Sequence, residues 1–277
     1  MPVYISDDLV TALAAEPGDF INPNSPRIGI ENLSNKSNIT TLSTTLATNP
    51  GWLTATPSTA ERWKSGAATY HVWIAEIGGQ VFDYVGIAAH RGLVGQTIEI
   101  AYKVGAAASV IIYGPKMVTR QEPIFIIVPP VGADQVFVRI YGLIAFEFEI
   151  GIINVGNTVA LPRNIYVDHT PINLGRKTSR LVSNSDNGQF LGQISLKSST
   201  QSAVAMSNIP PDYYRTTIYE RFSLPAETLP FFWAWRPYSY PNEVGFCWLN
   251  DDVNVNNSMA NGYMSMNFSM TGTVNNG

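Results

Sequence analysis

Three histidines are the side chains of this sequence best suited to acid-base chemistry: His71, His90 and His169. A Ser-His-Asp hydrolase also needs a nucleophile within reach of the histidine and a third group that orients the ring. None of the three lies near a nucleophile motif such as the Gly-x-Ser-x-Gly elbow. The sequence therefore predicts no catalytic residues and no enzyme activity.

Glu147 and Glu149 are the strongest candidates for a pair of catalytic carboxylates. Alternate residues of one strand stand about 6.5 to 7 Å apart on the same face, which suits the acid and the base of a glycosidase. The same alternation places Phe146, Phe148 and Ile150 on the opposite face. This pattern is typical of a half-buried strand whose glutamates face water or a charged neighbour, and we prefer that interpretation.

One loop offers hard oxygen ligands of the kind that calcium prefers. Its acidic residues are Asp251 and Asp252, and Asn250, Asn254 and Asn256 lie beside them. The spacing lacks the glycine and the distal glutamate of an EF-hand loop. We therefore expect a turn rich in Asn and Asp and predict no metal and no cofactor, while calcium near Asp251 stays an open alternative.

Four residues are candidates for binding carbohydrate: Asn49, Trp52, His90 and Arg91. An exposed aromatic face with amide and guanidinium donors can hold a sugar. The loop that ends in Trp52 and the predicted strand end at His90 and Arg91 would supply these groups. The alternative is that Trp52 only fixes its own loop.

Aromatic residues cluster between 231 and 240, together with one arginine. Aromatic side chains and arginine are the usual anchors of protein interfaces. Strand alternation directs about half of the cluster into the core. The candidate interface residues are Trp233, Trp235, Arg236, Tyr238 and Tyr240.

Arg176, Lys177 and Arg180 form the densest basic group of the sequence. They fall in a segment from Gly175 to Gly188 that we expect to be a loop. These side chains would pair with acidic residues of a neighbouring subunit. A solvated loop without a partner is an equally consistent interpretation.

Composition favours protein partners over nucleic acid. Of the 277 residues, 14% are charged and 11% are aromatic, and the net charge is −4. An average protein has about a quarter of its residues charged, so much of this surface must be neutral. The 17 basic residues are scattered and outnumbered by 21 acidic ones, which argues against a phosphate-binding face.

The single Cys247 rules out an internal disulfide, and its neighbours Phe246 and Trp248 indicate a buried thiol. The first eight residues lack the basic start and the apolar run of a signal peptide. The longest apolar stretch, 124–131, is broken by two prolines and too short to span a bilayer. We therefore expect synthesis in a cytoplasm and no membrane insertion.

Closely spaced strand patterns predict a mainly β protein with an N-terminal β-sandwich. The expected strands follow a strapping segment that has an amphipathic turn at 7–14 and a strand at 27–33. They cover 70–77, 81–90, 96–103, 109–113, 124–128, 135–141 and 144–153. The first three end at glycine or charge, and successive strands are expected to be antiparallel.

The pattern changes near residues 154–162, which predicts two domains, 1–158 and 159–277. In the second we expect a hairpin of 189–197 with 201–207, and strands at 230–236, 244–249 and 262–271. One helix is predicted near 210–222, capped by Asn208 and ended by Pro225. Tyr214, Ile218 and Phe222 would form its buried stripe.

Three segments carry a resemblance to a known fold. These are Ser25 to Leu33, Pro57 to Ser65 with its Arg62-Trp63 pair, and the strand, Gly-Gly, strand passage of 70–91. Together they resemble the galactose-binding-like, or discoidin-like, jelly-roll sandwich of bacteriophage virion proteins. The second half, with 231–237 followed by 244–249, resembles the C-terminal half of tail-tip proteins of long-tailed phages.

The resemblance implies a structural subunit of a phage tail tip, similar to distal tail proteins. Such a subunit would form a symmetric ring between the tail tube and the receptor-binding parts. Its partners would be further copies of itself and other tail proteins, and it would be located in the virion tail after synthesis in the host cytoplasm. The alternative function is a carbohydrate-binding adhesin that contacts a glycan of the host surface.

Overall fold

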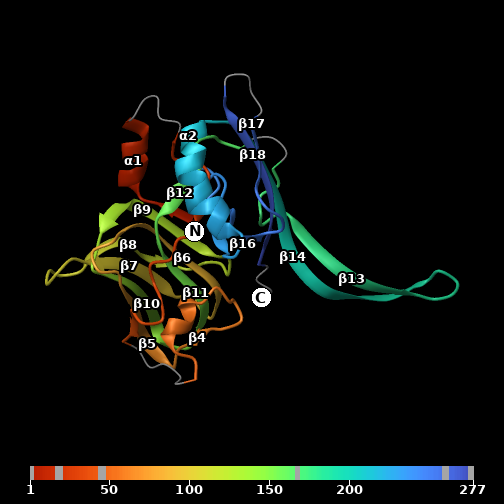
Figure 1. Ribbon diagram of the computed structural model, residues 1–277. Coiled ribbons are helices and arrows are strands. Elements are labelled where there is room, and N and C mark those ends of the chain that lie inside the picture. The colour runs from red at the N-terminus through yellow and green to blue at the C-terminus, as the bar shows by residue number, and fades with distance from the viewer. Residues whose placement is uncertain (1–2, 16–20, 43–47, 166–168, 258–261, 274–277) are drawn as a thin grey trace.

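The computed structural model describes residues 3–15, 21–42, 48–165, 169–257 and 262–273. Its architecture is mainly β, as the strand patterns predict, and comprises three sheets (Figure 1). Two five-stranded sheets form a sandwich, and a third, larger sheet is built mainly from the C-terminal half. No helix in these ranges is both long and apolar enough to cross a bilayer.

The first sheet of the sandwich has the order β1-β9-β6-β11-β4. Its strands are antiparallel to their neighbours except for β1, which runs parallel to β9. The bounds are β1 (Val3–Ile5), β4 (Trp63–Lys64), β6 (Val81–Arg91), β9 (Ile124–Gly132) and β11 (Glu149–Gly156).

The second sheet has the order β3-β5-β10-β7-β8 and is antiparallel throughout. The bounds are β3 (Ile39–Thr41), β5 (Ala68–Glu76), β7 (Thr97–Lys103), β8 (Val110–Met117) and β10 (Gln135–Phe146). In β10, Val136, Val138 and Ile140 are buried and alternate with less buried residues. This period of two is expected of a strand with one face on the core.

The third sheet has the order β12-β2-β15-β16-β18-β14-β13, and β17 pairs with β18. The bounds are β2 (Arg27–Gly29), β12 (Thr158–Ala160), β13 (Arg176–Asn184), β14 (Phe190–Ile209), β15 (Phe231–Ala234), β16 (Val244–Leu249), β17 (Asn254–Asn257) and β18 (Met264–Gly272). The segment at 27–29 thus contributes a strand to this sheet rather than to the sandwich.

The first sheet is the middle of three layers. One of its faces packs into the sandwich core, which includes the fully buried Trp63, Trp73 and Phe82. The other face carries side chains such as Tyr84 and Phe125, which pack against side chains of the third sheet, and together these form a separate core cluster. Burial on both faces explains the continuous apolar run of β9.

The helix of the second half is longer than predicted. It comprises α2 (Pro211–Tyr213), a π-helical segment (Tyr214–Ser223) and α3 (Leu224–Ala226), and we refer to it as the 211–226 helix. Its buried stripe of Tyr214, Ile218 and Phe222 is confirmed.

Both predicted limits of this helix are wrong. Asn208 lies in β14, and Pro210 precedes the first helical residue. Pro225 does not end the helix, because the preceding turn is widened: the Leu224 amide bonds to the Tyr219 carbonyl five residues earlier. A wide turn leaves room for the proline ring.

Near the N-terminus, α1 (Asp7–Ala15) is a helix of nine residues, more than the predicted turn. A short 3₁₀ helix, η1, spans Gly51–Ala55.

The predicted hairpin of 189–197 with 201–207 is wrong, because both segments belong to the single strand β14. The chain reverses earlier, between β13 and β14. Gly188 adopts a φ of 78° there, and its amide bonds to the Ser185 carbonyl. Glycine adopts such a left-handed conformation at little cost, whereas the residues around Ser199 give no comparable turn signal.

Candidate functional site

The most unusual feature of the molecule is a two-stranded ribbon that projects from the body (Figure 1). It consists of β13 and the outer half of β14, and we call residues 176–199 the arm. The inner half of β14, from Gln201 on, pairs with β18 and has buried side chains such as Val204 and Met206, and Thr200 pairs with both β13 and β18. The outer half pairs with β13 alone. The arm is therefore a ribbon without a covering layer.

The arm exposes large apolar side chains on both of its faces. Leu181 and Ile194 are register partners and so share one face, while Val182 pairs with Gln193 on the other. Apolar residues with 50% to 65% of their surface exposed are Leu181, Val182, Phe190, Leu191, Ile194 and Leu196. The sequence pattern does not reveal this group, because it predicts a loop from Gly175 to Gly188 and a hairpin of 189–197 with 201–207.

The basic residues Arg176, Lys177 and Arg180 lie on strand β13 of the arm, not in a loop. Lys177 Nζ donates to Gln201 Oε1 at 3.1 Å, and Arg176 Nη2 donates to Ser198 Oγ at 3.3 Å. No ion pair within the described ranges involves these three cations. They are thus available to acidic groups of another molecule.

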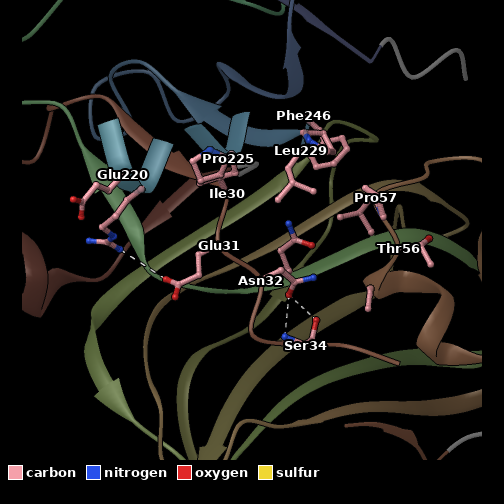
Figure 2. A pocket seen from close by; sticks show the side chains of 15 residues that line it. Ile30, Glu31, Asn32, Ser34, Thr56, Pro57, Glu220, Pro225, Leu229 and Phe246 are labelled. Carbon is pink, nitrogen blue, oxygen red and sulfur yellow. Dashed lines mark hydrogen bonds and ion pairs between the residues drawn. The ribbon is translucent and has the colours of Figure 1, made fainter. Parts of the chain in front are cut away.

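A cleft of about 500 Å³ lies between the sandwich and the 211–226 helix, and we call it the helix-sandwich cleft (Figure 2). Buried apolar residues such as Ile30, Ile152 and Phe246 line part of it. Glu31 and Glu220 lie at one side, where Arg221 Nη2 approaches the Glu31 carboxylate at 3.8 Å.

Asn32 holds the chain at the wall of the cleft next to Glu31. Its Oδ1 accepts hydrogen bonds from the Ser34 amide at 3.1 Å, the Ser34 hydroxyl at 2.6 Å and the Val155 amide at 3.3 Å. These bonds attach the segment after β2 to β11. The cleft is therefore preformed, with a fixed wall and an acidic side.

The predicted aromatic interface is only partly available. Trp233 is fully buried beneath the third sheet, so its assignment to an interface is corrected: it alternates inward and fills the core. Trp235 stacks on Tyr240 with ring centroids 5.5 Å apart, and Arg236 lies over both rings. Tyr238 is exposed beside them. Trp235, Arg236 and Tyr240 thus form one compact, half-exposed cluster.

A second hollow lies at one end of the sandwich and brings two predicted carbohydrate-binding residues together. Asn49 and Arg91 line this polar hollow of about 600 Å³. Arg62 and Lys64 line it too, and both pair with Glu149, at 3.2 and 2.7 Å.

The other two predicted residues lie outside this hollow. Trp52 carries the ammonium of Lys36 at 4.2 Å from its ring, and it does not line the hollow. His90 is buried with its Nε2 2.9 Å from the Glu122 carbonyl oxygen, and burial lowers the pKa of this histidine. Among the described residues that line it, the hollow therefore has polar groups for a sugar but no aromatic platform.

The predicted strand of 144–153 is interrupted, which separates the two glutamates. β10 ends at Phe146 and β11 begins at Glu149, so Glu147 lies in the exposed connection. Hydrogen bonds from Lys64 and Arg62 lower the pKa of Glu149. A carboxylate held between two cations is a poor proton donor.

The remaining histidines have structural contacts. His71 is buried between the rings of Phe146 and Phe148, each 4.9 Å away. His169 Nδ1 lies 3.0 Å from the Ala203 carbonyl oxygen and 3.4 Å from Ser202 Oγ. The Ser202 hydroxyl donates to the Thr170 carbonyl at 2.6 Å, so its proton does not point to the histidine.

The sequence leaves calcium near Asp251 as an alternative and predicts a buried thiol at Cys247. Within the described residues, no group of three or more His, Cys, Asp or Glu side chains could hold a metal ion. The prediction that Cys247 is a buried thiol is confirmed, and burial raises its pKa.

Comparisons with known proteins give limited similarities. No family model and no curated protein matches this chain. Chitosan-binding module 1 of a chitosanase/glucanase from Paenibacillus sp. IK-5 is 14% identical with a TM-score of 0.41, over 45% of this chain and 98% of that module.

Two other solved structures are similar over a comparable share of this chain. The family 32 carbohydrate-binding module of Clostridium perfringens NanJ, in complex with galactose, is 11% identical with a TM-score of 0.37, over 47% of this chain and 98% of that one. A GH29 fucosidase of Ruminococcus gnavus is 13% identical with a TM-score of 0.40, over 46% of this chain and 26% of the enzyme. At these scores the similarities carry no conclusion about what this chain binds.

Proposed function

We propose that this protein is a non-catalytic structural subunit that joins a protein assembly through its arm. The observation that carries the proposal is the exposure of six large apolar side chains on an uncovered two-stranded ribbon. An isolated hairpin is marginally stable in water. Full burial of one such side chain contributes about 1.5 to 3 kcal/mol, so covering the arm with a partner strongly favours association.

The finer form of this proposal is a subunit of a bacteriophage tail tip that forms a ring below the tail tube. It rests on the resemblance of 25–33, 57–65, 70–91 and 231–249 to virion proteins. A virion location and contacts with other tail proteins belong to the same proposal. A projecting arm that joins one subunit to the next suits a ring of this kind.

The proposal is tested by the oligomeric state of the protein extracted from its native source. Wild-type protein should elute from size-exclusion chromatography in a complex heavier than the monomer. Leu181→Asp with Ile194→Asp should release the monomer. The matched control is Val110→Asp with Ile111→Asp, because these side chains of β8 are each 50% exposed outside the arm. An arm variant that stays in the complex would refute the proposal.

A carbohydrate-binding adhesin is the second candidate. It is supported by the convergence of Asn49, Arg91 and Glu149 in the polar hollow, where amide, guanidinium and carboxylate groups offer both donors and acceptors to a sugar. The absence of an aromatic platform among the residues that line this hollow ranks it below assembly. A glycan array should show a signal that Arg91→Ala abolishes and the exposed-helix control Arg215→Ala retains. No signal for wild type would remove this candidate.

A further inference from the structure

The arm and the helix-sandwich cleft are two surfaces of one chain with complementary chemistry. We propose that the arm of one copy docks into the helix-sandwich cleft of a second copy. This inference rests on the proposed function, because it names the partner of the arm. The arm supplies exposed apolar side chains and three cations. The cleft supplies apolar walls and two glutamates, of which Glu31 pairs with Arg221 and Glu220 is exposed.

The arm and the rest of the chain carry net charges of opposite sign. Residues 176–200 contain four of the 17 basic residues and one of the 21 acidic residues. This gives the segment a formal charge of +3 and leaves −7 on the remainder of the chain. A basic arm is therefore attracted to the body of another copy, and complementary charge of this kind directs and orients association.

The same charge disfavours the contact of one arm with another. The free edge of β13 is the obvious place for two arms to pair strand to strand. Such pairing would bring Arg176, Lys177 and Arg180 of both copies close together. Like charges across paired strands are destabilising, so the body of a second copy is the better partner.

The cleft has the features that an apolar, basic ribbon requires. Its volume of about 500 Å³ is large enough for apolar side chains to enter between the sandwich and the helix. Leu229 follows the helix, is 41% exposed and points into the cleft (Figure 2). Leu224 is exposed on the helix itself. Glu220 lines the cleft and is exposed, and Glu227 is exposed directly after the end of the helix, outside the cleft lining. Lys177 and Arg180 of an incoming arm would pair with these two glutamates.

The arm and the cleft share no residue, so both remain available on every copy. The contact is therefore heterologous: the arm of each copy joins the cleft of the next. A heterologous contact closes into a ring when the rotation between neighbours allows it, and otherwise it continues as a filament. Repeated docking of this type would give the symmetric assembly without any further partner.

A mixing experiment tests this pairing. The arm variant is Leu181→Asp with Ile194→Asp, and the cleft variant is Glu220→Arg with Leu229→Arg. All four side chains are exposed, so both variants should keep the wild-type circular dichroism and melting temperature. In sedimentation velocity, each variant alone should be a monomer. An equimolar mixture should form a one-to-one dimer, because one intact arm and one intact cleft remain.

A charge exchange provides a second test. Lys177→Glu with Arg180→Glu should weaken self-association at least about tenfold, and adding Glu220→Arg with Glu227→Arg should restore it. Adding Glu76→Arg with Glu147→Arg is the control and should not restore it, because these exposed glutamates lie on the sandwich outside the cleft.

Several outcomes would overturn the inference. A mixture that stays monomeric while wild type associates would point to arm-to-arm contact or to another surface. Wild type that stays monomeric at all concentrations, while its native complex still depends on the arm, would show that the partner is a different protein. In that case the proposed function survives. An arm variant that remains in the native complex would refute both the docking of the arm into the cleft and the proposed function.

Discussion

Phe232 of β15 stacks on Phe125 of β9, with ring centroids 5.6 Å apart and an interplanar angle of 15°. The two residues belong to different sheets and lie 107 positions apart in the chain. Their contact, with Tyr84 and Phe246 around it, joins the third sheet to the middle layer. The arm is therefore mounted on a body whose third sheet packs against the sandwich through a core cluster of its own.

Gly86→Ala should destabilise this junction. A Cβ at Gly86 would lie closer than 3.0 Å to the Phe232 ring, which cannot move freely because it stacks on Phe125. We expect the free energy of unfolding to fall by about 1 to 3 kcal/mol, the usual cost of overpacking. Urea denaturation measures this. Gly132→Ala in β9 is the control, since its Cβ would meet only an ordinary contact at 3.8 Å, and an equal loss there would contradict the explanation.

β14 should show two rates of amide hydrogen exchange along one strand. Residues 201–206 pair with β18 and are buried at alternate positions, whereas 190–198 pair only with β13 and are mostly exposed. In the monomer, we expect the outer segment to exchange much faster, because an uncovered hairpin opens readily. Exchange followed by mass spectrometry checks this, and the outer segment should become protected on association. Uniform protection in the monomer would show that the arm is stable without a partner.

Asp83 should make stability fall as the pH rises from about 4 to 6. Burial raises the pKa of this carboxyl to about 6 from an ordinary 3.8, although the Thr158 amide and hydroxyl bond to it. In this range the folded state binds more protons than the unfolded state, so the free energy of unfolding decreases with pH, by at most about 3 kcal/mol. Asp83→Asn should flatten this dependence in urea titrations at pH 4, 5, 6 and 7. An unchanged slope would assign it to other groups.

Glu149 should have the opposite effect to Asp83: its contribution to stability is lost as the pH falls. Its pKa lies below the ordinary 4.5 because Lys64 and Arg62 bond to the ionised form. The stabilising contribution is present above about pH 4.5 and is lost as the pH falls through the lowered pKa. Glu149→Gln should reduce stability at pH 7 and reduce the further loss on acidification, which thermal unfolding at pH 7 and pH 3 measures. A variant as stable as wild type at pH 7 would show that these ion pairs are too well solvated to contribute.

Local pattern predicts much of this fold. The alternation in β10, the stripe of Tyr214, Ile218 and Phe222, and the burial of Cys247 all follow from the neighbours of each residue. Periods of two and 3.6 residues reveal which side chains share a face, because they are set by the geometry of a single strand or helix. The mainly β architecture follows from the same signals.

The features of the fold that local pattern does not predict depend on contacts between distant segments. Sequence alternation does not say whether the outer face of β6 and β9 meets water or, as it does here, a third sheet. Nor does it distinguish a strand that is covered from one that projects, and the pattern therefore predicts a loop and part of a hairpin where the arm lies. Trp233 and Trp235 are two residues apart, yet one is fully buried and the other half-exposed. Exposure depends on which elements pack against a face, and only the tertiary structure specifies that packing.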